Sequence, residues 1–207
     1  MDGSSLQNLI SKSWGTAARR IGMPCKVYRP TQIANPLNSR NRVFKLNCSF
    51  APLAGEAVGT TGYSGQLWRG TFDSAYTMPG DYLQTPQVIY FIGSQIALQP
   101  VVCVQTNSVI SIERPQPAQT GSYSGFIAET SIEVISVWPA LLTPVSFRIP
   151  GTLPDTHFGV WSCFLPLLPS LPAVADILSD DSGRRFVIAS AQPTTLGWRL
   201  GMRQLDG

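Results

Sequence analysis

The sequence predicts a mainly β protein. We expect an N-terminal amphipathic helix and extended arm, followed by two related small antiparallel β-barrel or sandwich-like halves. Three observations support this: one helical period near the N-terminus, many short β-branched and aromatic runs after it, and a weak internal repeat. Glycine (18) and proline (17) are frequent and scattered, which suits many strands and turns. The expected divisions are 1–38 for the helix and arm, 39–114 for the first β domain and 115–207 for the second.

The helix is expected over residues 4–21. Its apolar residues recur at spacings of three and four, which places them on one face. Gly22 and Pro24 end the pattern, and basic residues near that end suit the helix dipole. We expect the helix to bind a partner through Leu6, Leu9, Ile10 and Trp14, with Arg19 and Arg20 at its basic end.

The segment after the helix is restrained by prolines, at 27–30 and again at 35–37. This pattern predicts an extended arm rather than a core strand, with Tyr28 and Arg29 available to the same partner. Strands are expected from residue 42 onward, and a Gly/Thr-rich loop over 54–65. The runs 101–106 and 109–112 predict a hairpin that turns at Asn107 and Ser108.

The internal repeat links two stretches about 95 residues apart. Asp81-Tyr82-Leu83 is echoed by Asp176-Ile177-Leu178, and an aromatic-aliphatic run follows each. We predict one β-hairpin used twice, each copy beginning with an aspartate that accepts backbone N–H groups in a turn. A catalytic aspartate pair is disfavoured because no His, Cys or Lys recurs beside the two aspartates. The repeated structural positions are Asp81, Leu83, Tyr90 and Ile92, and Asp176, Leu178, Phe186 and Ile188.

Charge is unevenly placed along the chain. Residues 1–45 hold eight basic residues and one acidic residue, whereas the remainder holds seven basic and eleven acidic residues. Such asymmetry indicates a nucleic-acid, membrane or acidic-protein partner for the basic part, or a solvated helix face. Charged residues are only 13% of the chain, about half the usual share, which suggests a surface partly covered by partners.

The sequence motifs of common enzymes are missing. There is no P-loop, dinucleotide-binding glycine motif or H-E-x-x-H motif, and His157 is the only histidine. Cys25, Cys48, Cys103 and Cys163 are not spaced as zinc ligands, so we expect buried thiols, although one disulfide stays possible. We therefore expect no enzyme activity, no cofactor and no metal. No secretory signal or membrane-spanning run is expected, which favours synthesis in the cytoplasm.

Several stretches resemble structural proteins of tailed bacteriophages and prophages of proteobacteria. These are 17–22, 25–30 and 35–37 near the N-terminus, 80–83, 90–92, 98–100 and 112–115 in the middle, and 176–187 and 196–200 near the C-terminus. The resemblance implies a virion component of the neck or tail, such as a head-tail connector, adaptor or tail-completion ring. It further implies portal, adaptor or tail subunits as partners, a homo-oligomeric ring, incidental contact with packaged DNA and no membrane.

Two other functions stay open at this stage. A nucleic-acid-binding module could use the basic N-terminal region, with Trp14, Tyr28 and Phe44 stacking on bases. A tail hub or carbohydrate-binding domain could use some of the five tryptophans. However, Trp138, Trp161 and Trp198 lie in strand contexts typical of a core, and the only adjacent carboxylates, Asp180 and Asp181, lie in a predicted turn.

Overall fold

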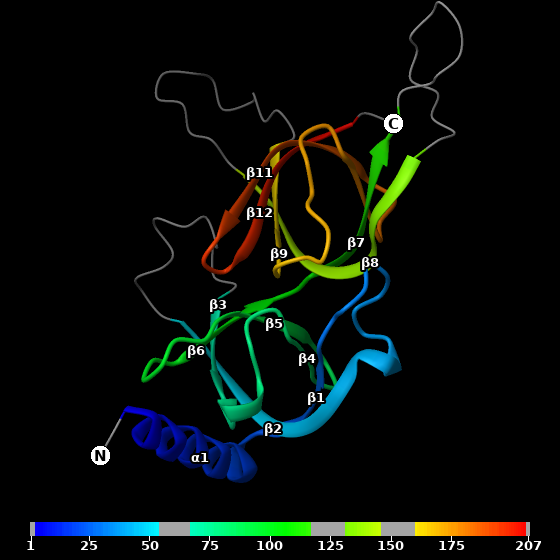
Figure 1. Cartoon of the computed structure of the whole chain (residues 1–207). Coiled ribbons are helices and arrows are strands. Elements are labelled where there is room, and N and C mark those ends of the chain that lie inside the picture. The colour runs from blue at the N-terminus through cyan, green and yellow to red at the C-terminus, as the bar shows by residue number, and fades with distance from the viewer. Residues whose placement is uncertain (1–2, 54–66, 117–130, 146–159, 206–207) are drawn as a thin grey trace, which may run out of the picture. The chain divides into compact units, whose positions relative to one another are not determined.

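The computed structural model describes residues 3–53, 67–116, 131–145 and 160–205. One α-helix, α1 (Gly3–Ile21), is followed by short 3-10 turns and strands, which Figure 1 traces in chain order. The chain forms two compact units. The first comprises Met1–Thr31, Pro36–Thr106 and Thr194–Gly197, and the second Gln32–Asn35, Asn107–Pro193 and Trp198–Gly207.

Barrel 1, in the first unit, is a closed antiparallel barrel of six strands. Their order around the barrel is β1-β2-β3-β6-β5-β4, and β4 pairs with β1 to close it. The strands are β1 (Met23–Tyr28), β2 (Arg42–Pro52), β3 (Leu67–Thr71), β4 (Tyr82–Gln84), β5 (Ile89–Ser94) and β6 (Val101–Gln105), with 3-10 turns η1 (Ser39–Asn41) and η2 (Ser74–Tyr76).

Barrel 2 is a second closed barrel of six strands, ordered β7-β8-β9-β12-β11-β10 and closed by pairing of β10 with β7. Adding six to each strand number of barrel 1 gives this order, so the two barrels have the same topology. The strands are β7 (Ser108–Pro115), β8 (Ser131–Pro144), β9 (Val160–Leu165), β10 (Ile177–Asp180), β11 (Arg185–Thr194) and β12 (Gly197–Gln204).

The predicted fold class is therefore confirmed: a mainly β chain with one N-terminal helix and two related antiparallel barrels. The repeated hydrophobic residues hold equivalent places. Leu83, Tyr90 and Ile92 belong to the core of barrel 1. Leu178, Phe186 and Ile188 are fully buried in barrel 2.

The segment expected to be an arm forms the first strand of barrel 1, and this part of the expectation was wrong. Cys25 and Val27 are buried in β1, which pairs with β2 on one side and β4 on the other. Pro24 and Pro30 lie near the two ends of the strand, so neither interrupts its pairing. Barrel 1 thus begins with β1 rather than at residue 39.

The hairpin expected over 101–112 does not form. β6 pairs with β3 and β5, whereas β7 pairs with β8 and β10. At the junction, the N–H of Thr106 donates to Ile89 O and the N–H of Asn107 donates to Ala140 O, so the chain leaves one barrel and enters the other. The second barrel accordingly begins with β7 (Ser108) rather than at residue 115.

Some expectations fall outside the described residues. These are the loop at 54–65 and His157.

Candidate interaction surface

The face of α1 that docks on barrel 1 is made of small residues. Ser11, Gly15 and Ala18 are buried. The Ser11 and Ser74 hydroxyl oxygens lie 3.0 Å apart, within hydrogen-bonding distance. A Cβ at Gly15 would lie 2.8 Å from the Cβ of Asp73, closer than atoms pack. The helix can therefore approach η2 closely because these side chains are small.

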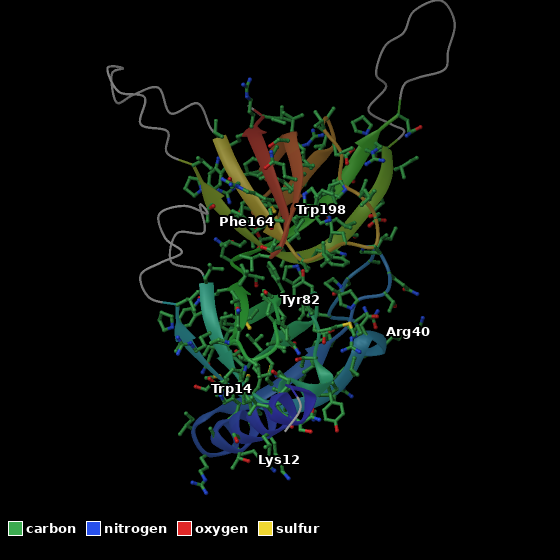
Figure 2. All side chains as sticks on the ribbon, turned by 60° about the vertical axis from the view of Figure 1, so that its left-hand side comes forward. Lys12, Trp14, Arg40, Tyr82, Phe164 and Trp198 are labelled. Carbon is green, nitrogen blue, oxygen red and sulfur yellow. The ribbon has the colours of Figure 1, made fainter. Side chains whose placement is uncertain are left out.

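The predicted apolar stripe is only partly used in this docking. Trp14 packs against the core of barrel 1, and Figure 2 shows it directed toward the barrel, with Lys12 directed away. Leu6 and Leu9 remain 41% and 49% exposed, and Ile21 is 74% exposed. Successive residues turn by about 100° around a helix, so Ile21 lies about a quarter-turn from the docking face, whereas Leu6 lies nearly opposite it. We call Leu6, Leu9, Ile10 and Ile21 the α1 apolar row.

Basic side chains border this row. Lys12, Arg19 and Arg20 are exposed, and α1 contains no acidic residue. Arg19 and Arg20 lie in the last turn, where cations interact favourably with the helix dipole. The first part of α1 is tied to the β5–β6 connection by a 2.6 Å hydrogen bond from the N–H of Leu98 to Gln7 Oε1. The result is an apolar row with a positive border on a helix fixed to the barrel.

Tyr28 and Arg29 were predicted to join this surface, but the structure places them in the wall of barrel 1. Tyr28 is 5% exposed, and its hydroxyl donates to Gln84 Oε1 at 3.0 Å. Arg29 is held by Asp81 through two hydrogen bonds of 2.8 Å. Both side chains therefore serve the barrel rather than the surface of α1.

Arg29 and Asp81 form the closing contact of barrel 1. The guanidinium binds both carboxylate oxygens of the buried Asp81 and also donates to the Tyr76 carbonyl at 3.0 Å. The N–H of Met78 donates to Asp81 Oδ2 at 3.0 Å. Since Arg29 follows β1 and Asp81 precedes β4, the pair ties together the two strands that close the ring.

Barrel 2 repeats this arrangement atom by atom. Arg114, at the end of β7, binds both oxygens of Asp176 at 2.8 and 2.9 Å and donates to the Leu171 carbonyl at 2.9 Å. The N–H of Ala173 donates to Asp176 Oδ2 at 2.8 Å. We call the two arrangements the closing clamps. Sequence reasoning singled out both aspartates but missed both arginines, although an Arg-Pro pair at 29–30 and 114–115 was a visible signal.

Electrostatics in the clamps favour the charged guanidinium. Hydrogen bonds to Asp81 and Asp176, together with their negative charge, raise the pKa of Arg29 and Arg114 above the ordinary arginine value, while burial opposes the rise. Each aspartate is almost completely buried and has its charge matched. The clamps are therefore closed ion pairs with a structural role and no free acid or base.

The other residues weighed for sugar or base binding do not gather into one site. Trp138 is fully buried, and its Nε1 donates to Ile33 O at 2.6 Å. Asp180 binds Arg184 within the β10–β11 turn, and Asp181 accepts from the Ser108 hydroxyl at 2.8 Å. Phe44 lies edge-on to Tyr76, with ring centroids 6.5 Å apart. Trp161 and Trp198 are half-buried in barrel 2 strands.

The four cysteines are buried and free. Cys25, Cys48 and Cys103 lie in the core of barrel 1, where a hydrogen bond with Cys48 and then burial raise the pKa of Cys25. Burial raises the pKa of Cys103 and of Cys163. Within the described ranges, no group of three or more His, Cys, Asp or Glu side chains is arranged to hold a metal ion. In the same ranges, no helix has the length and apolar character needed to cross a bilayer.

Comparison of this chain with protein-family models, curated proteins and solved structures found no match.

Proposed function

We propose that this chain is a non-enzymatic structural protein that joins neighbouring proteins in the virion of a tailed phage, in the head-to-tail connection. Leu6, Leu9 and Ile21 of the α1 apolar row are exposed on the same helix as the basic residues, and this observation carries the joining role. The phage assignment rests on the sequence resemblance. Barrel 1, closed by its clamp, supplies the base on which that helix is held.

The proposed contact is a helix laid in a groove of a neighbouring subunit. Leu6, Leu9 and Ile10 would enter an apolar groove, and Arg19 and Arg20 would meet carboxylates at its edge. Burying three such side chains is worth several kcal/mol in total, at about 1.5–3 kcal/mol for each fully buried side chain. If the neighbour is another copy in a ring, the contact joins two different patches and closes by rotation.

The virion assignment is tested by mass spectrometry of purified particles from the phage or induced prophage that encodes this chain. We expect the protein at a few to a dozen or so copies for each portal ring. Its absence from the particles would overturn the virion assignment.

The role of α1 is tested separately with the variant L6E/L9E. We expect its incorporation into particles to fall at least about tenfold, because charges would be placed in an apolar contact. The matched control is L167E/L171E, which changes two leucines of barrel 2 that are 60% and 69% exposed. Normal incorporation of L6E/L9E, or an equal loss in the control, would contradict docking through α1.

A further inference from the structure

A hollow lies on barrel 2, over the neighbouring strands β9, β12 and β11. Its volume is about 430 Å³. Ser162 on β9 is the cross-strand partner of Gly201 on β12, and Ser190 on β11 lies next to the same glycine. Three small residues on adjacent strands thus form one low region in the surface. The hollow is separate from α1, which belongs to the other compact unit.

Gly201 has no side chain to fill the hollow. A Cβ at position 201 would lie 2.5 Å from the Ser190 hydroxyl oxygen, so a larger residue would have to displace that hydroxyl. Ser162 is only 5% exposed, yet it lines the hollow. The hydroxyl groups of Ser162 and Ser190 therefore lie at the floor of the hollow, where a ligand inside it can reach them.

Two arginines border the floor. Arg199, Gly201 and Arg203 alternate along β12, so they share one side of the strand, while Leu200 and Met202 are buried on the other. The Arg199 guanidinium carbon lies 5.8 Å from the centroid of the Phe164 ring, a cation–π distance that holds this side chain across the sheet. Both arginines line the hollow, together with Trp161.

These arginines differ from the paired ones. Arg29, Arg114 and Arg184 each bind a buried aspartate. In the part of the chain that the structure describes, neither Arg199 nor Arg203 has an acidic partner within ion-pair distance. Among the described residues these two guanidinium groups therefore have no counterion, and they can bind an anion.

We propose that this hollow binds a carboxylate side chain in an acidic peptide segment of another protein. Two guanidinium groups and two serine hydroxyls are donors matched to carboxylate oxygens, and apolar lining from Val145 and Val160 suits a peptide chain. A nucleic-acid backbone is a poorer match, because it calls for an extended basic track. The described residues of barrel 2 are balanced, with basic Arg114, Arg184, Arg185, Arg199 and Arg203 and acidic Glu113, Glu133, Asp176, Asp180 and Asp181.

The test measures binding of a fluorescein-labelled hexaglutamate peptide to the full-length protein by anisotropy at low salt. We expect R199Q/R203Q to weaken binding by about tenfold or more, since each lost charge-assisted contact is worth about a factor of ten. Two control variants remove arginines elsewhere: R185Q on the adjacent strand β11, and R19Q/R20Q on α1. We expect each control to change the affinity less than about twofold, the size of a surface electrostatic effect.

A third variant, S190A, keeps the charge and removes one hydroxyl, and a smaller loss of about threefold is expected because the lost hydrogen bond has an uncharged donor. The proposal is overturned if hexaglutamate does not bind, or if R185Q or R19Q/R20Q loses as much affinity as R199Q/R203Q. It is also overturned if a 12-nucleotide single-stranded DNA binds more tightly than the peptide and is the ligand lost in R199Q/R203Q. Thermal melting of every variant establishes that the barrels remain folded.

Discussion

Barrel 1 and barrel 2 share their closure and differ in their surfaces. Both have the same strand order, and both tie the first strand to the fourth with an arginine that grips a buried aspartate. In barrel 1, α1 covers part of β2, β3 and η2. In barrel 2, no helix in the described residues takes that place, and the hollow with two unpaired arginines lies on β9, β11 and β12.

This difference indicates which features of a repeated fold bear on function. A contact kept in both copies, such as the closing clamp, is explained by the need to close a barrel and says little about partners. A feature present in one copy needs another reason. The α1 apolar row and the arginine-bordered hollow are such features, and this is why both proposals are built on them.

Breaking the clamps is expected to have the largest effect. D81N in barrel 1 and D176N in barrel 2 each leave an arginine without its buried counterion, which costs about 3–5 kcal/mol of stability. Because the contacts match, the two losses should agree within about 1 kcal/mol. Hydrogen exchange followed by mass spectrometry gives the stability of each barrel separately.

The control for this pair is D181N, which changes an exposed aspartate that accepts one hydrogen bond from Ser108. Its expected cost is about 1 kcal/mol or less. If D81N is tolerated while D176N is not, the equivalence of the two clamps would be disproved.

Alkaline pH should produce a somewhat smaller difference between the stabilities of the two barrels. Thiols whose folded pKa is raised keep their protons when the unfolded chain loses them, so stability is full below pH 9.0, the ordinary thiol pKa, and falls above it. Barrel 1 has two such thiols, Cys25 and Cys103, and barrel 2 has Cys163. Each one removes up to about 1.4 kcal/mol per pH unit.

Barrel 1 should therefore lose stability about twice as steeply as barrel 2 between about pH 9 and pH 10.5. Urea unfolding in the presence of a reductant measures the slope. The variant C25A/C103A removes both groups, so the slope of barrel 1 should fall below that of barrel 2, whereas C103A alone should bring the two slopes level. An unchanged slope in the double variant would show that other groups cause the alkaline loss; Tyr90, whose pKa burial also raises, is the first alternative.

A substitution that displaces α1 tests whether the stability of barrel 1 depends on the packing of this helix. A Cβ at position 15 would lie only 2.8 Å from the Cβ of Asp73, so the larger side chain of G15V should cost about 1–3 kcal/mol. T16V introduces the same valine at the next position of the helix, which is exposed, and should cost much less. Exchange protection in α1 and η2 should fall in G15V only, while barrel 2 stays unchanged.

The sequence was sufficient for the features that depend on local pattern. The helical period predicted α1, and alternating strands with turn residues predicted the β class and the repeated hairpin, because these signals lie within a few neighbouring residues. Asp81 and Asp176 could be found for the same reason, since each begins a recognisable hairpin.

Long-range pairings could not be found this way. Arg29 lies 52 residues before Asp81, and Arg114 lies 62 residues before Asp176, so nothing local joins them. The membership of β1 in barrel 1 depends on pairing with β4, which is equally remote. The docking of α1 on barrel 1 was not predicted either, because it depends on the steric fit of Ser11, Gly15 and Ala18 rather than on the apolar stripe.

The smallest expected effect concerns the residue just before each clamp aspartate. Gly80 has φ of 94° in barrel 1, and Ala175 has φ of 72° at the equivalent place in barrel 2. Glycine adopts this left-handed region freely, whereas alanine is strained there by about 1 kcal/mol. G80A should therefore destabilise barrel 1 by about 1 kcal/mol, with no clash because no atom lies within 4 Å of the added Cβ.

The reverse change, A175G, should stabilise barrel 2 by up to about 1 kcal/mol, since it relieves the same strain. A173G is the matched control: it makes the same substitution two residues away, where φ is not positive, and should destabilise because glycine adds freedom to the unfolded chain. Thermal and urea unfolding of the three variants measures these signs. If A175G and A173G shift stability in the same direction, backbone strain at position 175 is not what distinguishes the two turns.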